Sequence, residues 1–275
     1  MAEERIDRRR VLSAVPVLAG LAGIGRLGPL LAQEDEARLE NLVEFQRLVA
    51  ANRILANEGV VDAFGHVSVR HPANARRYVM SRSRSPELVE FDDLMEFEQT
   101  GEPVDPRGRR GYSERMIHGA VYEARPDVNA VIHHHAYAVL PFGLTSTPLR
   151  PVIHNATVIG RHVPVWDIRD EFGDTNMLVR TMEMGRSLAR TLDQNTCLLM
   201  AGHGAVVVGE TVQLAVKAAV YLQVNARVLS EALRLGEPRQ FTDGEIELSA
   251  AMENSPLGAE RAWEYFCLRA GVEPI

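Results

Sequence analysis

The segment GYSERMIHGAVYEARPDVNAVIHHHAY, residues 111–137, decides the fold of this chain. Its first part predicts a helix with Glu114 at the start, and its second part predicts a turn and a short apolar strand over residues 128–132. Three consecutive histidines follow the strand. Because side chains alternate between the two faces of a strand, we expect His133 and His135 on one face and His134 on the other.

Two imidazoles on one side of a strand end, with a carboxylate one helix upstream, suit a divalent transition metal. The alternative is a polar strand end with solvated histidines, and we favour the metal. His203, which lies between Gly202 and Gly204 at a bend in an apolar region, is a candidate third ligand. Three histidines leave one or two coordination positions open, as catalytic sites do.

Composition limits the functional classes. The chain has 275 residues, of which 46% are hydrophobic, so it is long and apolar enough for one domain with a full core. Its net charge of −7 argues against a nucleic-acid partner. Lys217 is the only lysine and lies inside a helical pattern, which argues against Schiff-base chemistry. Cys197 and Cys267 show no metal-type or redox-type spacing and are interpreted as buried thiols.

Residues 1–32 resemble a twin-arginine export signal. Arg8, Arg9 and Arg10 precede a weakly apolar run rich in glycine and alanine. The alternatives are a membrane anchor or a disordered tail, but Arg26 and several glycines interrupt the run. We therefore expect a periplasmic or exported protein with no stable membrane span after signal removal, or a cytoplasmic one if the signal does not work. Residues 33–275 are expected to form a single domain.

The rest of the chain interleaves helices and strands. Helices are predicted over residues 34–57, 177–192, 212–235 and, as a pair, 243–270, with a helical turn at 137–142. Strands are predicted over residues 63–70, 78–81, 92–98, 151–154, 163–166, 196–200 and 205–208. This order predicts an α/β fold in which helices cover both faces of a sheet.

Several ordered pieces of the chain resemble the class II aldolase/adducin family, which includes fuculose- and ribulose-phosphate aldolases and epimerases. The pieces are GHVSVR at 65–70, Ser113-Glu114, RPDVNAVIHHH at 125–135, and His203-Gly204 with Gly209 behind. The resemblance covers roughly residues 36–235. It implies a three-layer α/β/α fold with a central, mostly antiparallel sheet, and a homotetramer with active sites at subunit contacts.

The resemblance also implies roles for individual residues. It assigns His133, His135 and His203 as metal ligands and Glu114 as the catalytic acid/base. Zinc is favoured, although Mn, Fe, Co and Ni accept the same ligands. A metal that chelates a hydroxyl and a neighbouring carbonyl or carboxylate oxygen stabilises an enediolate, which retro-aldol cleavage and decarboxylation share. Proton transfer by Glu114 calls for a pKa near neutrality.

The chain departs from the sugar-phosphate members where they hold phosphate. His66 replaces an asparagine, Ser83-Arg84 replaces Thr-Gly, and Arg84 fills space that a phosphate needs while offering a partner for a carboxylate. A tyrosine that serves as an acid in the aldolases falls near His154. The pattern is similar to members that decarboxylate dihydroxyphthalates or carboxy-muconic semialdehydes. The predicted substrate contacts are His66, Ser83, Arg84, Ser113 and His154.

We therefore expect a metal-dependent carbon–carbon lyase, with decarboxylation of a small hydroxy or oxo carboxylate, which includes aromatic ones, favoured over aldol cleavage of a non-phosphorylated hydroxy-oxo acid. An epimerase and a non-catalytic, adducin-like scaffold are the further alternatives. For His66 and His154 a structural role is an equal alternative. His118 lies one helical turn after Glu114 and is expected to orient it.

Overall fold

The fold comes from a computed structural model that describes residues 28–275. Contacts divide the chain into residues Met1–Ala37 and Arg38–Ile275. Most of the predicted export segment, residues 1–27, lies outside the described residues, and the predicted domain boundary stays a prediction. None of the described helices is both long enough and apolar enough to cross a bilayer.

A seven-stranded sheet with the order β3-β2-β1-β4-β7-β6-β5 forms the centre of the second unit. Every neighbouring pair is antiparallel except β5 and β6, which are parallel. The predicted α/β fold with a mostly antiparallel sheet is therefore confirmed. The strands are β1 (His66–Arg70), β2 (Arg77–Ser81), β3 (Leu94–Glu98), β4 (Ala130–His134), β5 (Val165–Trp166), β6 (Cys197–Met200) and β7 (Gly204–Gly209).

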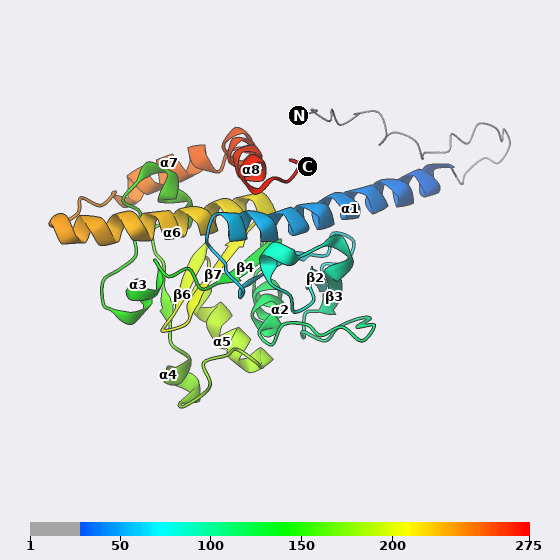
Figure 1. The fold of residues 1–275 in the computed structure, drawn as a ribbon, viewed down its shortest axis with the longest axis horizontal. Helices are drawn as coiled ribbons and strands as arrows, with labels where there is room; N and C mark the ends of the chain where they lie inside the picture. Colours follow the sequence, from blue (N-terminus) through cyan, green and yellow to red (C-terminus); the bar gives the residue numbers. More distant parts are fainter. Residues whose placement is uncertain (1–27) are drawn as a thin grey trace, which may run out of the picture. The chain divides into compact units, whose positions relative to one another are not determined.

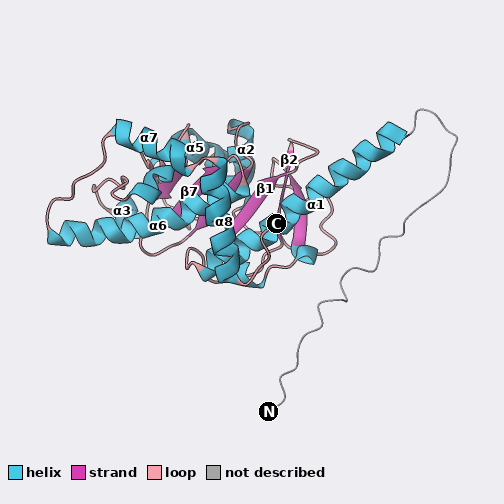
Figure 2. Cartoon of the chain, turned by 90° about the horizontal axis from the view of Figure 1, so that it is seen from above, coloured by secondary structure: helices cyan, strands magenta, loops and turns pink. Residues whose placement is uncertain are grey.

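Helices cover both faces of the sheet (Figure 1). The α-helices of the described residues are α1 (Gly28–Asn57), α2 (Arg115–Ala124), α3 (Leu140–Leu144), α4 (Ile168–Phe172), α5 (Met182–Leu192), α6 (Val212–Leu235), α7 (Asp243–Glu253) and α8 (Pro256–Ala270). Figure 2 shows α6 and α8 in front of the strands when the molecule is seen from above. The helices predicted over 212–235 and 243–270 are confirmed, and Thr211, Thr242 and Ser255 cap them with side-chain oxygens.

Two buried clusters lie on opposite faces of the sheet. One packs α6, α8 and the end of α1 against the strands, and Ile132 of β4 belongs to it. The other packs α2 and α5 against the opposite face, and Val131 of β4 belongs to it. Because neighbouring residues of β4 enter different clusters, the strand is buried on both faces. His133 thus faces the α2 layer, and His134 faces the α6 layer.

Two predicted elements are wrong. Residues 151–154 form no strand, because the backbone N–H of Val152 donates to the side chain of Asn225 on α6. The helix predicted from residue 177 begins only at Met182, where Thr181 caps it. Met177 has a positive φ of 66°, which a helix does not allow, so the residues before Thr181 form a loop.

Candidate metal centre

Four side chains converge beside the ends of β4 and β7. Glu114 precedes α2, His133 lies in β4, His135 follows it, and His203 lies in the turn between β6 and β7. One ligand atom from each lies within 4.8 Å of all the others. The structure therefore brings together the four residues that the sequence analysis assigned to a metal site and its acid/base.

The separations between these atoms suit one ion. Oε2 of Glu114 lies 3.6 Å from Nε2 of His133 and 3.5 Å from Nε2 of His203. The Nε2 atoms of His133 and His135 are 2.9 Å apart. Ligands held at 2.0–2.1 Å around a tetrahedral ion would be about 3.4 Å from each other. The four atoms thus have the spacing of ligands around a single cation.

Backbone groups fix the orientation of three of these side chains. Nδ1 of His133 lies 3.1 Å from the carbonyl oxygen of Ala205, and Nδ1 of His203 lies 2.9 Å from that of Met177. A carbonyl oxygen only accepts hydrogen bonds, so each ring carries its N–H at Nδ1 and keeps the Nε2 lone pair for a metal. The backbone N–H of Val179 donates to Oε1 of Glu114 at 2.9 Å, which leaves Oε2 for the cluster.

The loop before α5 is therefore part of the site, and the sequence analysis missed it. Met177 supplies the carbonyl for His203, and Val179 supplies the amide for Glu114. Leu178 lines the adjoining cavity. The contributing groups are backbone atoms that every residue possesses, so no residue type in this loop could have indicated the role.

Gly204 permits the close contact of β4 and β7 at this point. A Cβ atom on Gly204 would lie 2.3 Å from the carbonyl oxygen of His134 and 2.9 Å from Cδ2 of His135. Any larger residue would push β4 away from the turn that holds His203. Gly202 on the other side has a φ of +68°, as the tight turn requires.

The electrostatics of the cluster favour metal-binding forms. Burial acts to raise the pKa of Glu114, but its interactions with the adjacent His133 and His203 outweigh burial and hold the pKa well below its usual range. This direction is opposite to the shift toward neutrality that proton transfer by Glu114 calls for, and it favours the carboxylate form that binds a metal. Burial, followed by the neighbouring histidines, lowers the pKa of His135 to about 4, so its imidazole is neutral.

A cavity of about 400 Å³ is lined by Glu114, His135 and His203 of the cluster. Four of the predicted substrate contacts line it: His66, Ser83, Arg84 and Ser113. The remaining lining residues include Phe64, Gly65, Ser85, Tyr112 and Leu178. The structure does not bring His154 to this cavity. His154 is half-exposed at the start of the 3-10 helix His154–Ile159, with Nδ1 3.1 Å from Glu253 of α7.

The charge of Arg84 is partly compensated. Its Nη1 donates to Asp93 at 2.5 Å and lies 3.6 Å from Glu90. Asp93 also accepts a hydrogen bond from Arg82 at 2.6 Å. Arg84 therefore contributes less positive potential to the cavity than an unpaired arginine would, which disfavours a highly charged ligand group such as phosphate.

His118 contacts His66 and not Glu114, so its expected role is corrected. Its Nε2 lies 2.7 Å from Nδ1 of His66, and its Nδ1 lies 2.6 Å from Oγ of Ser68. Oγ of Ser68 lies 2.8 Å from the hydroxyl of Tyr122. All four side chains are buried. Burial lowers the pKa of His118 to about 3, lowers that of His66 well below its usual value, and raises that of Tyr122.

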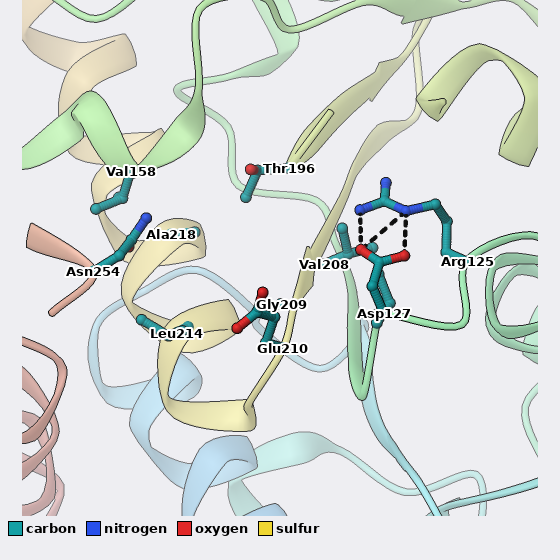
Figure 3. A pocket seen from close by; sticks show the side chains of 11 residues that line it. Arg125, Asp127, Val158, Thr196, Val208, Gly209, Glu210, Leu214, Ala218 and Asn254 are labelled. Carbon is teal, nitrogen blue, oxygen red and sulfur yellow. Dashed lines mark hydrogen bonds and ion pairs between the residues drawn. The ribbon is translucent and has the colours of Figure 1, made fainter. Parts of the chain in front are cut away.

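A second cavity of about 230 Å³ lies at the opposite ends of β4 and β7, where Arg125, Asp127 and Glu210 line it (Figure 3). The guanidinium of Arg125 is bound by Asp127 at 2.6 Å and by the backbone carbonyls of Asp193 and Asn195. Its donors are engaged within the chain, so this cavity has no free cationic group comparable to a ligand-binding arginine.

A comparison of the sequence with protein-family profiles identifies a known family. The sequence profile of the Class II Aldolase and Adducin N-terminal domain matches residues 46–230. This chain belongs to the class II aldolase/adducin family. The family resemblance inferred from the sequence is confirmed.

Relatives in the family include decarboxylases. "Decarboxylase tropJ" of Talaromyces stipitatus is 30% identical over 244 residues, which cover 81% of this chain and 92% of the relative. The 3,4-dihydroxyphthalate decarboxylase of a Terrabacter species is 27% identical over 243 residues, which cover 83% and 97%. The structure of L-fuculose 1-phosphate aldolase from Glaciozyma antarctica PI12 has a TM-score of 0.70 and 25% identity, covering 86% of this chain and 91% of that chain.

Proposed function

We propose that this protein is a divalent-metal-dependent carbon–carbon lyase that decarboxylates a small hydroxy or oxo carboxylate, with aromatic carboxylates the favoured class. The observation that carries the proposal is the convergence of three imidazole Nε2 atoms and one carboxylate oxygen within 4.8 Å, beside a cavity of about 400 Å³. The named decarboxylases that match more than four fifths of the chain support the choice of reaction.

His133, His135 and His203 would hold the ion, and zinc is favoured over Mn, Fe, Co and Ni. When bound, the ion would polarise the substrate by chelating a hydroxyl and a neighbouring oxygen and would stabilise the electron pair left by the departing carbon dioxide. The carbonyls of Ala205 and Met177 would keep His133 and His203 oriented, because both contacts use Nδ1 and leave Nε2 for the ion.

Glu114 would move the proton. As a carboxylate it accepts the hydrogen of the substrate hydroxyl. It then returns that hydrogen to the carbon atom whose bond to the carboxylate breaks. The products are carbon dioxide and the deprotonated hydroxy compound, so charge and hydrogen balance without another reactant. Val179 keeps one oxygen of Glu114 occupied, and proton transfer uses the other.

The second candidate is aldol cleavage of a non-phosphorylated hydroxy-oxo acid. The fold of L-fuculose 1-phosphate aldolase, with its TM-score of 0.70, favours it. The compensated charge of Arg84 argues against a phosphorylated substrate. An epimerase would use the same ion without breaking a carbon–carbon bond. A non-catalytic, adducin-like scaffold would have no need of the four converging side chains.

We also propose that the protein is a homotetramer and is exported through its twin-arginine segment. The first proposal is tested by analytical ultracentrifugation, where a monomer at micromolar concentration would contradict it.

The main test compares two adjacent histidines. His133→Leu removes a ligand from the cluster, whereas His134→Leu changes a side chain on the opposite face of the same strand. Both variants and the wild type are purified, freed of metal, reloaded with zinc or manganese and assayed for bound metal and for carbon dioxide release from 3,4-dihydroxyphthalate and related hydroxybenzoates.

We expect His133→Leu to lose metal and activity and His134→Leu to keep both. Wild-type metal content in His133→Leu would overturn the proposal. Product analysis separates the alternatives, since an aldolase releases an aldehyde or ketone, an epimerase yields an isomer, and a scaffold yields no product.

A further inference from the structure

We infer that a buried chain of hydrogen bonds, Tyr122–Ser68–His118, holds His66 in the tautomer that carries its N–H at Nε2. His66 would then act as a hydrogen-bond donor to an anionic oxygen of the substrate in the cavity. The role toward substrate rests on the proposed function, whereas the tautomer of His66 depends only on the contacts within the chain.

The chain is assembled from two elements. His66 and Ser68 are two residues apart in β1 and therefore share one face of the strand. His118 and Tyr122 are four residues apart in α2 and therefore share one face of the helix. α2 packs on this face of the sheet, so the four side chains form one continuous row. The contacts along the row, from Tyr122 to His66, measure 2.8, 2.6 and 2.7 Å.

The direction of these hydrogen bonds follows from counting hydrogens. The hydroxyl of Tyr122 carries one hydrogen, and Oγ of Ser68 is the acceptor that it contacts among the described residues. Ser68 therefore accepts from Tyr122 and gives its own hydrogen to Nδ1 of His118. A neutral imidazole has one N–H, so that of His118 lies at Nε2 and points to Nδ1 of His66.

His66 is left with its N–H at Nε2. In the reverse direction the hydroxyl of Tyr122 would be a buried donor without an acceptor in the described part of the chain. Such an unpaired donor disfavours the reverse arrangement by roughly ten- to a hundredfold. The order Tyr122 to Ser68 to His118 to His66 therefore pairs every hydrogen inside the row and leaves only the N–H of His66, at the end that lines the cavity, for a ligand.

Nε2 of His66 is available to a ligand in the cavity. His66 lines it, and its Nε2 makes no hydrogen bond within residues 28–275. β1 pairs His66 directly with His133 of β4, and the two rings lie 5.1 Å apart. The ring of Tyr112 lies 4.7 Å away on another side. A donor placed beside the metal ligands suits a phenolate, enolate or carboxylate oxygen of a chelated substrate.

The tautomer can be observed without turnover. The full-length, zinc-loaded protein is labelled with ¹⁵N-histidine, and long-range ¹H–¹⁵N correlation spectra show which ring nitrogen carries hydrogen. Signals of His66 are assigned by their absence in His66→Gln. We expect His66 to be protonated at Nε2 and not at Nδ1. Protonation at Nδ1 in the wild type would overturn the inference.

Two serine variants test the control of the tautomer. Ser68→Ala interrupts the row, so both tautomers of His66 should appear. Ser187→Ala removes an equally buried hydroxyl that bonds Trp166 and Glu171 outside the row, and the wild-type tautomer should remain. A single unchanged tautomer in Ser68→Ala would show that the row does not set it.

Kinetics separates positioning from mere packing. His118→Leu removes the donor to His66 and is expected to lower kcat/KM by roughly 10- to 100-fold with zinc content unchanged. His118→Gln places an amide N–H near the lost Nε2 and should recover most of that loss. Equal losses in both variants would contradict a positioning role. Full kcat/KM in His66→Leu would contradict the donor role, even with the expected tautomer. If decarboxylation itself fails, the spectra still decide the tautomer.

Discussion

Replacing Gly204 by alanine would test whether the contact between β4 and β7 sets the geometry of the metal centre. The new Cβ would lie 2.3 Å from the carbonyl oxygen of His134, whereas such contacts essentially never fall below 3.0 Å. The backbones must therefore separate by at least 3.0 minus 2.3, which is about 0.7 Å. The shift displaces His134, which lies between His133 and His135. It exceeds the deviation of roughly 0.2 Å that a metal site tolerates in its metal–ligand distances.

The expected result is a loss of zinc affinity of roughly 10- to 100-fold, similar to other changes that misplace metal ligands. Overpacking of a dense strand contact should also cost about 1–3 kcal/mol in the free energy of unfolding. For a chain of this size that corresponds to a fall in Tm of about 2–12 °C. Affinity is measured by competition with a chromogenic chelator, and stability by thermal unfolding of the zinc-free protein.

Gly209→Ala is the matched control at the other end of the same strand. Its Cβ would lie 2.7 Å from the backbone nitrogen of Ala215, far along β7 from the cluster. We expect a comparable loss of stability with wild-type zinc affinity. The reasoning is refuted if Gly204→Ala binds zinc as tightly as Gly209→Ala does while both lose the same stability.

Four further variants test other parts of the structure. Burial acts to raise the pKa of Asp93, but hydrogen bonds from a backbone amide and two arginines lower it overall. Its contribution to stability is therefore complete above the unfolded pKa of about 3.9 and is lost as the pH falls through the lower folded pKa. The stability gap between wild type and Asp93→Asn in urea should accordingly shrink from pH 5 to pH 2, and a constant gap would contradict this. His134 has a buried Nε2 without a partner among the described residues. His134→Leu removes this unpaired nitrogen together with the acceptor of the Ala136 backbone N–H, so the two effects should nearly cancel in urea, and a loss above about 2 kcal/mol would count against this. Arg84→Ala is expected to raise KM for a carboxylated substrate with unchanged zinc content, and an unchanged KM would remove Arg84 from the site. Replacing Arg8 and Arg9 together by lysine should keep the protein in the cytoplasm of a bacterial host, as cell fractionation would show.

Some contacts at the site could be predicted from the sequence and others could not. Strand alternation predicts that His133 and His135 share a face, and the glycines around His203 indicate a close backbone approach. The loop that contains Met177 was predicted as a helix, because its apolar spacing continues that of α5. Only its backbone atoms act on the site, so side-chain patterns could not predict the contacts.

The prediction for His118 failed for a different reason. A spacing of four residues from Glu114 indicates contact only if both residues are helical. Glu114 precedes the first turn of α2, with φ and ψ of −101° and 19°, and its side chain leaves that helix face. His118 instead faces β1, where Ser68 and His66 lie. A spacing of four residues thus predicts a side-chain contact when both residues lie within the helix. It does not when one of them precedes the first helical residue.

The pairing register of β4 has a consequence for maturation of the protein. β4 carries His133 on one face and His134 on the other, opposite His66 of β1 and Ala205 of β7 respectively. A slip by one residue would exchange the two faces and present a single imidazole, in place of His133 and His135, to the ion. Such a misassembled sheet would bind metal weakly, so binding of an ion would favour molecules whose strands have paired correctly.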